Sequence, residues 1–198
     1  MDNFWSPFWI WESSIPNFIC DEIVTAYRNQ SLDEYDKGLI GYKGGVRDAE
    51  IRKTNILFLE ENWINTMLTG YIRYANSENF FYDLSNEDKE FTQLSRYTVG
   101  DYYHTHRDFS PCRGDSVHTR KLSLSLQLSD SNEYDGGDIL MDMSAWSDEF
   151  GESGFKPMSR SKGSVIVFDS RTPHKVTPIT RGTRYSLVKW YHGDTPLR

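Results

Sequence analysis

The chain has 198 residues and a net charge of −7, with 22 Lys and Arg against 29 Asp and Glu. This length suits one domain of about 100 to 200 residues, and no linker signal divides it. Its 11 Phe, 12 Tyr and 6 Trp supply enough apolar area for a packed core, which excludes a largely disordered chain. The acidic balance argues against nucleic acid as a partner, because such proteins carry a basic face.

Cysteine content and hydropathy indicate the compartment. Cys20 and Cys112 are too few for a disulfide framework or a thiolate metal cage, which favours a reducing environment. No apolar run approaches the roughly 18 residues of a membrane span. Residues 1–12 also lack the continuous apolar segment of a secretion signal. We therefore expect a soluble, cytoplasmic protein with no membrane partner.

The first part of the chain, about residues 1–89, has the pattern of a support layer of helices and a strand. The aromatic run from Phe8 to Glu12 predicts a strand, and apolar spacing predicts helices over 17–28 and about 63–74. The expected apolar stripe of the first helix comprises Phe18, Ile19, Ile23, Val24 and Tyr27. Between the helices, residues 36–53 contain four glycines and carry five basic against three acidic residues, so this segment is a candidate mobile loop.

From residue 90 onward the pattern changes to short β-prone runs separated by turn signals such as Tyr134-Asp135-Gly136-Gly137. Six strands are predicted, over about 91–99, 102–107, 120–128, 137–142, 164–168 and 183–191. Within 121–128 four leucines alternate with Ser123, Ser125 and Gln127, so the leucines should line one face of a strand. Helices followed by many short antiparallel strands indicate a β-barrel or sandwich supported by helices.

The tripeptide His106-Arg107-Asp108 falls at the end of a predicted strand, where a spacing of two residues places both side chains on one face. His174 follows the next-to-last predicted strand and a turn. Two imidazoles and one carboxylate on adjacent coordination positions form the facial triad of non-haem Fe(II) oxygenases. By itself the tripeptide also fits a simple strand-end pair in which His106 is hydrogen-bonded and Asp108 caps a turn.

Arg184 begins the last predicted strand, ten residues after His174. A buried guanidinium offers two parallel donors to a carboxylate, so Arg184 can grip the far end of a dicarboxylate whose other end reaches the metal. The alternative is an ordinary ion pair with one of the many acidic residues.

An ordered series of motifs carries a family resemblance over about residues 90–193. The motifs are Tyr97-x-x-Gly100-x-x-Tyr103-x-x-His106-x-Asp108, Arg120-Lys121-Leu122-Ser123, Gly136-Gly137-Asp138, Val167-Phe168-Asp169-Ser170, His174-x-Val176-x-Pro178 and Gly182-x-Arg184-x-Ser186-Leu187-x-x-Trp190. This series resembles the prolyl 4-hydroxylase branch of the 2-oxoglutarate and Fe(II)-dependent dioxygenases. The arginine at 184 is closer to the hypoxia-factor and bacterial hydroxylases, because collagen-type enzymes have lysine there.

The resemblance implies a mainly β fold, with a double-stranded β-helix (jelly-roll) core over about 90–193 and N-terminal helices, in one catalytic domain covering 1–198. It implies Fe(II) held by His106, Asp108 and His174, with no catalytic side chain beyond the metal centre. It further implies 2-oxoglutarate as co-substrate, O2, and ascorbate in a supporting role. The co-substrate residues expected from it are Arg184, Tyr97, Gln127 and Ser186. The substrate residues expected are Trp190, Tyr103 and Arg47.

One departure from the family pattern concerns Gln127. Related human hydroxylases have a tyrosine near this position that helps to hold the co-substrate, and the polar face of Ser123, Ser125 and Gln127 is the candidate replacement. Tyr97 and Trp190 also fit the simpler interpretation of packed core aromatics.

The implied reaction is hydroxylation of an unactivated C–H bond with succinate and CO2 as co-products, most plausibly prolyl 4-hydroxylation of a protein or peptide. The segments 36–53 and 151–163 are candidate lids over such a peptide. Hydroxylation of a free amino acid or small metabolite is the first alternative, and a non-enzymatic cupin-like metal-binding module is another. Net charge argues against a nucleobase demethylase, and Asp108 argues against a halogenase.

Three further histidines need an interpretation. His104 is expected in a supporting or surface position, because three ligands are already available. His118 and His192 lie near charged or glycine-containing segments and are expected to be exposed.

Overall fold

The computed structural model describes residues 6–28, 36–37, 50–86, 90–109, 119–144 and 154–193. It contains helix α1 (Asn17–Arg28), helix α2 (Asn62–Ala75) and a following π-helical turn, η1 (Asn76–Phe80). The strands are β1 (Phe8–Trp11), β2 (Asp36–Lys37), β3 (Arg52–Lys53), β4 (Asn55–Leu59), β5 (Thr92–Tyr97), β6 (Tyr102–His106), β7 (Thr119–Gln127), β8 (Tyr134–Gly136), β9 (Ile139–Asp142), β10 (Phe155–Pro157), β11 (Val165–Asp169), β12 (His174–Val176), β13 (Ile179–Gly182) and β14 (Arg184–Gly193).

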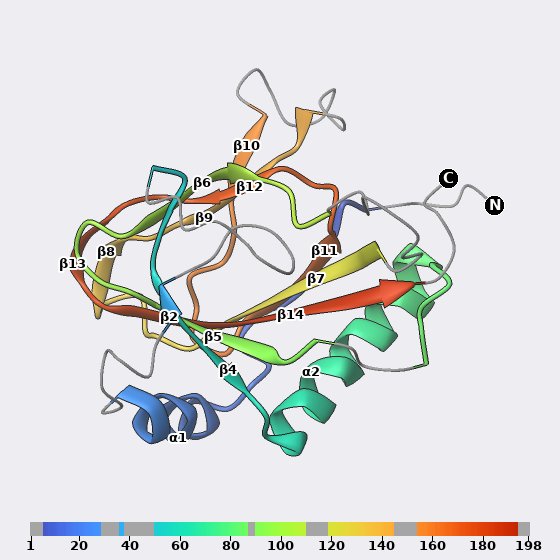
Figure 1. Cartoon of the computed structure of the whole chain (residues 1–198), viewed down its shortest axis with the longest axis horizontal. Helices are drawn as coiled ribbons and strands as arrows, with labels where there is room; N and C mark the ends of the chain where they lie inside the picture. Colours follow the sequence, from blue (N-terminus) through green and yellow to red (C-terminus); the bar gives the residue numbers. More distant parts are fainter. Residues whose placement is uncertain are drawn as a thin grey trace.

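The strands form two facing sheets. The large sheet has the order β1-β11-β7-β14-β5-β4-β2, and the small sheet has the order β10-β9-β12-β6-β3, while β13 and β8 form a separate pair. Figure 1 shows the small sheet over one side of the large sheet and both helices on the other side. The expectation of a mainly β domain with a jelly-roll core and supporting helices is confirmed.

Alternation along β7 and β14 separates an apolar face from a polar one. Leu122, Leu124, Leu126 and Leu128 are fully buried in the core shared with the helices, as the sequence pattern predicts. On the neighbouring strand β14, Leu187 and Tyr191 join the same core. Because successive strand side chains point to opposite faces, Gln127 with the serines of β7, and Arg184 and Ser186 of β14, face the space between the two sheets.

The helices pack against the large sheet through one stripe each. Helix α1 buries Cys20, Ile23 and Tyr27, whereas Phe18 is 65% exposed. The expectation that Phe18 belongs to the buried stripe is therefore wrong, because the helix turns the i, i+3, i+7 row starting at Cys20 toward the sheet. Helix α2 buries Ile64, Leu68, Ile72 and Ala75. No helix in the described part of the chain has the length and hydropathy needed to cross a membrane.

The second half contains more strands than the six expected, since β8, β10, β12 and β13 are each only three or four residues long. The expected turn at Tyr134-Asp135-Gly136-Gly137 is instead strand β8, which continues after two residues into β9, and these two strands run antiparallel to β13 and β12. Gly136 has φ +72°, and a Cβ there would lie 2.0 Å from the carbonyl oxygen of Pro178. The glycine is needed because the chain passes that close to the start of β13 in a left-handed conformation.

Candidate active site

Two neighbouring strands of the small sheet bring three metal-binding side chains together. His106 ends β6, Asp108 follows two residues later, and His174 begins β12 directly opposite His106 in the antiparallel register. The Asp108 carboxylate oxygens lie 3.6 Å from Nε2 of each histidine. One ligand atom from each of the three residues lies within 4.8 Å of the others. The three side chains expected from the sequence to form a triad are thus adjacent.

Main-chain carbonyls fix which ring nitrogen of each histidine is available. Nδ1 of His106 lies 2.9 Å from the carbonyl oxygen of His104, and Nδ1 of His174 lies 3.0 Å from that of Thr172. A carbonyl can only accept a hydrogen bond, so both Nδ1 atoms carry the proton. Nε2 of each ring therefore points toward the Asp108 carboxylate and is the nitrogen that remains available to a metal.

The protonation states of the cluster also suit a metal. Burial lowers the pKa of His174 to about 4, although the Asp108 carboxylate acts in the opposite direction. Burial raises the pKa of a carboxyl group, but His174 and His106 outweigh this effect and hold the pKa of Asp108 far below its ordinary value. At neutral pH Asp108 is therefore ionised and His174 is neutral, which are the states in which these two side chains bind a cation.

Aromatic packing holds the triad in place. The ring of Tyr103 stacks on His106, with centroids 3.4 Å apart and planes 13° from parallel. The Arg52 guanidinium lies 4.6 Å from the centroid of Tyr103 on β6. Phe168 meets His174 edge-on at 4.9 Å. Burial raises the pKa of Tyr103 to about 12, so its hydroxyl stays protonated. The structure thus places Tyr103 against a triad histidine.

Arg184 is a buried cation, 1% exposed, on the face of β14 that points between the sheets. Its Nε donates to Oε1 of Gln127 at 3.0 Å, and its Nη1 lies 3.4 Å from Oγ of Ser186. Nη2 is buried without a hydrogen-bond partner. Within the described parts of the chain, no carboxylate lies within ion-pairing distance of this guanidinium. The alternative of an ordinary ion pair thus has no partner in those parts of the chain.

The other expected co-substrate residues surround Arg184. Tyr97 is its register partner on β5, with the guanidinium carbon 5.7 Å from the ring centroid. Ser186 pairs with Gln127 across β14 and β7. All three side chains are buried. The structure therefore brings Arg184, Tyr97, Gln127 and Ser186 into one polar cluster.

Trp190 belongs to a network that the sequence did not indicate. Its indole is 7% exposed, and the Arg120 guanidinium lies 3.9 Å from the ring centroid. Arg120 donates two hydrogen bonds to the Glu90 carboxylate, at 2.7 and 2.5 Å. Nε2 of His192 lies 2.9 Å from the same carboxylate. The expectation of an exposed His192 is wrong, because alternation along β14 turns it inward beside Trp190.

The sequence pattern predicts no role for Arg120 or Glu90, and only Arg120 carries a weak sequence signal. Arg120 opens the strand whose polar face was recognised, and its charge contributes to the low pKa of Asp108. Glu90 gave no signal, since it precedes its strand and is one of 29 acidic residues. Burial raises the pKa of a carboxyl group, but hydrogen bonds from His192 and Arg120 hold the pKa of Glu90 below its ordinary value.

The remaining expectations have separate outcomes. His104 is exposed and only its carbonyl oxygen touches the triad, in line with a supporting position. Arg47 and His118 lie outside the described residues, as does most of the segment 36–53. From the segment 151–163, Arg160 binds the Asp138 carboxylate at 2.9 Å and Lys162 pairs with Asp21.

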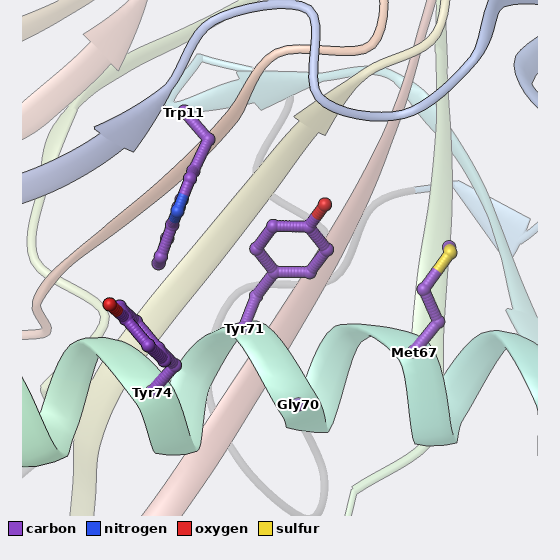
Figure 2. Close-up of a pocket in the computed structure, with 5 residues that line it drawn as sticks. All are labelled: Trp11, Met67, Gly70, Tyr71 and Tyr74. Atoms are coloured by element: carbon purple, nitrogen blue, oxygen red, sulfur yellow. The ribbon is translucent and has the colours of Figure 1, made fainter.

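An open hollow of about 300 Å³ lies elsewhere, between β1 and α2. Figure 2 shows Trp11 from β1 above the helix, facing Tyr71 and Tyr74, with Gly70 and Met67 completing the lining. The Trp11 ring lies 4.9 Å from Tyr71 and 5.9 Å from Tyr74. Because α2 covers the side of the large sheet opposite the small sheet (Figure 1), this hollow is separate from the triad.

Known relatives agree with the geometry. The profile of the 2OG-Fe(II) oxygenase superfamily matches residues 92–192. A PKHD-type hydroxylase of Gloeothece citriformis is 30% identical over 134 residues, which is 67% of this chain and 57% of the relative. Another, from Thermosynechococcus vestitus, is 36% identical over 98 residues, covering 49% of this chain and 40% of the relative. The chain thus spans about half the length of these curated relatives.

Solved structures share the fold. A prolyl 4-hydroxylase of Pseudomonas putida superposes with a TM-score of 0.69 at 20% identity, covering 94% of this chain and 92% of that one. A prolyl hydroxylase of Trichoplax adhaerens, solved with a hypoxia inducible factor peptide fragment, gives 0.71 at 17% identity, covering 95% and 84%. At this identity the likeness concerns the fold alone. Because the superfamily profile covers both strands of the triad and the strand of Arg184, this chain belongs to the 2OG-Fe(II) oxygenase superfamily.

Proposed function

We propose that this chain is an Fe(II)- and 2-oxoglutarate-dependent hydroxylase that acts on an unactivated C–H bond, with a prolyl residue of a protein or peptide as its substrate. The observation that carries the proposal is Arg184, a buried cation whose Nη2 has no partner, on the interior face that also meets the triad sheet. Membership of the superfamily supports the same chemistry.

The residues present fit both groups. Two imidazole nitrogens and one carboxylate, from His106, His174 and Asp108, are the donors that non-haem Fe(II) takes while leaving coordination positions open. The unmatched guanidinium of Arg184 fits one carboxylate of a dicarboxylic acid, because it offers planar, paired donors. Ser186, Gln127 and Tyr97 close the space around that guanidinium.

When bound, Fe(II) with 2-oxoglutarate and O2 supplies the oxidising chemistry, and succinate and CO2 are the co-products. The protein holds and orients the reactants. His104 and Thr172 carbonyls keep the imidazoles turned toward the metal position. Arg184 fixes the far carboxylate of the co-substrate, and the aromatic rings of Tyr103 and Trp190 limit access of water.

A prolyl substrate is supported by the aromatic character of this interior. Tyr103, stacked on His106 of the triad, and Trp190 on β14 make this interior aromatic, which suits an apolar proline ring better than a charged side chain. The similar solved proteins from Pseudomonas putida and Trichoplax adhaerens are both described as prolyl hydroxylases.

The test is incubation of the purified protein with Fe(II), 2-oxoglutarate, ascorbate and a panel of proline-containing peptides, with free proline as a separate arm. Mass spectrometry should detect one added oxygen atom on a peptide together with stoichiometric succinate. Hydroxylation of free proline alone would replace the peptide assignment with the small-molecule alternative. Iron binding without succinate formation would refute the hydroxylase and favour a metal-binding module.

A matched pair of variants tests the metal assignment. His106→Ala removes a triad ligand and should abolish 2-oxoglutarate turnover, whereas His104→Ala changes an exposed side chain on the same strand and keeps the main-chain carbonyl that orients His106. Equal loss in both variants would contradict the assigned roles.

A further inference from the structure

The amide of Gln127 is fully used within the fold. Its Oε1 accepts a hydrogen bond from Nε of Arg184 at 3.0 Å, while its Nε2 donates to the hydroxyl of Tyr134 at 2.9 Å and to the carbonyl of Ser129 at 3.1 Å. This orientation is fixed, because a guanidinium only donates and a carbonyl only accepts. Gln127 therefore has no N–H left to offer a ligand carboxylate.

The hydroxyl of Tyr134, unlike the Gln127 amide, has a hydrogen-bond donor that is not used within the described parts of the chain. It accepts the hydrogen bond from Gln127, so its own proton must go to another acceptor. Tyr134 is only 1% exposed, and no residue in the described parts of the chain accepts that proton. A buried phenol with an unused proton indicates an acceptor that binds from outside the protein, since buried donors in native proteins have partners.

Tyr134 and Arg184 border the same space. A Cβ placed on Gly137 would lie 3.2 Å from Cδ of Arg184 and 3.4 Å from Cε2 of Tyr134. Both side chains also pack with Tyr97, whose ring is 5.7 Å from the guanidinium carbon and in the same apolar cluster as Tyr134. Arg184 contributes its own unpartnered donor, Nη2. Two unmatched donors in one buried region suit a single carboxylate.

The ring of Tyr134 is also held from its other side. The Arg160 guanidinium lies 4.5 Å from the ring centroid, and Nη2 of Arg160 donates to the Tyr134 carbonyl at 2.9 Å. Arg160 is itself fixed by the Asp138 carboxylate. The hydroxyl is therefore preorganised before any ligand enters, which lowers the cost of binding.

We infer that Tyr134 donates a hydrogen bond to the distal carboxylate of 2-oxoglutarate beside Arg184, and that Gln127 is a positioning residue that orients both donors. The inference rests on the proposed function. In this arrangement Gln127 acts on the co-substrate through Arg184 and Tyr134. Tyr134 supplies from β8 the hydroxyl that related hydroxylases carry on the strand corresponding to β7.

The first test is Tyr134→Phe, which removes only the hydroxyl. Binding of 2-oxoglutarate to the Fe(II)-loaded protein is measured by anaerobic calorimetry. A hydrogen bond to a charged group contributes enough that the dissociation constant should rise about 10- to 100-fold. The matched control is Tyr71→Phe, on the helix side of the large sheet, where the affinity should equal that of the wild type.

A second readout separates carboxylate binding from a general structural effect. 2-Oxobutyrate has the same 2-oxo acid group as 2-oxoglutarate but no distal carboxylate. Its affinity should be the same in the wild type and in Tyr134→Phe, so the variant should lose only its preference for 2-oxoglutarate.

Gln127→Leu tests the positioning role and serves as the independent variant if Tyr134→Phe does not fold. It should raise the KM for 2-oxoglutarate about tenfold and leave the KM for peptide unchanged, because the hydrogen bonds of the amide within the described residues go to Arg184, Tyr134 and Ser129. Wild-type affinity in Tyr134→Phe, or an equal loss for both oxo acids, would overturn the inference. A wild-type protein that fails to bind 2-oxoglutarate would instead overturn the proposed function.

Discussion

Replacing Arg184 with methionine should separate two effects of its buried charge, namely the loss of stability in the ligand-free protein and the gain in affinity for the co-substrate. Without a ligand, Arg184 is 1% exposed, and in the described parts of the chain its hydrogen-bond partners are Gln127 and Ser186, both neutral. Burying a charge without a counter-ion costs several kcal/mol, while the orphaned Gln127 oxygen in Arg184→Met costs about 1–3 kcal/mol. We therefore expect the ligand-free variant to be at least as stable as the wild type.

The same substitution should remove the response to the co-substrate. Truncating a partner of a buried carboxylate costs about 2–5 kcal/mol, which corresponds to at least about a 30-fold loss of affinity. At a 2-oxoglutarate concentration of about 100 times the wild-type Kd, the ligand stabilises the wild type by roughly 2.7 kcal/mol. With a Kd raised about 30-fold, the variant gains less than about 1 kcal/mol at the same concentration.

Thermal unfolding of the Fe(II)-loaded protein under anaerobic conditions measures both effects. For a domain of this size about 1 kcal/mol shifts Tm by roughly 2–4 °C, so the wild type should gain about 5–11 °C with 2-oxoglutarate and the variant at most about 4 °C. Arg184→Lys should retain part of the shift, since the charge is kept. A variant that is destabilised by more than about 2 kcal/mol and still shows the full ligand shift would refute the reasoning.

Three further results are expected. In the metal-free protein, burial lowers the pKa of His174 to about 4, so between about pH 6.5 and 4 this side chain gains a proton only in the unfolded state. The free energy of unfolding, measured by urea titration, should therefore fall by about 3 kcal/mol over this range. His174→Gln should abolish this pH dependence, and a pH dependence that persists would exclude His174 as its source. Glu90→Gln should loosen Arg120 over Trp190 and raise the peptide KM several-fold, while calorimetry shows unchanged 2-oxoglutarate affinity; a loss of both would contradict a role confined to the Trp190 network. Leu124→Ala should lower the free energy of unfolding by about 2–5 kcal/mol with unchanged 2-oxoglutarate affinity in the folded protein, and altered affinity would show that the two faces of the sheet are coupled.

The strands that sequence predicts well are those with a local signal. The alternating leucines of β7 specify a buried face without reference to any other segment, and the helix over Asn17–Arg28 follows from its apolar spacing. Strands of two to four residues, such as β3 and β12, have no such period. They exist because a neighbouring strand supplies their hydrogen bonds, as β6 does for both. Their positions are determined by the tertiary fold.

The same distinction applies to the site. The sequence singles out His106, Asp108, His174 and Arg184 because they stand at motif spacing, and the structure brings the first three together. The local sequence indicates only a turn at Tyr134, because nothing local shows that its hydroxyl reaches Gln127 on another strand. Residues that act on a partner from a distant strand leave no period or spacing in the sequence, so only the three-dimensional contact identifies them.

The placement of the core explains how this fold tolerates a charged interior. The largest apolar cluster lies on the helix side of the large sheet and includes the leucines of β7 together with α1 and α2 residues. Among the described residues, the two apolar clusters on the other side contain five and four buried residues. Because burial on the helix side provides most of the hydrophobic stabilisation, the space between the sheets can hold Arg184, Gln127 and the triad without loss of the fold. A ligand that pairs with the unmatched Nη2 of Arg184 then adds stability on this side of the large sheet.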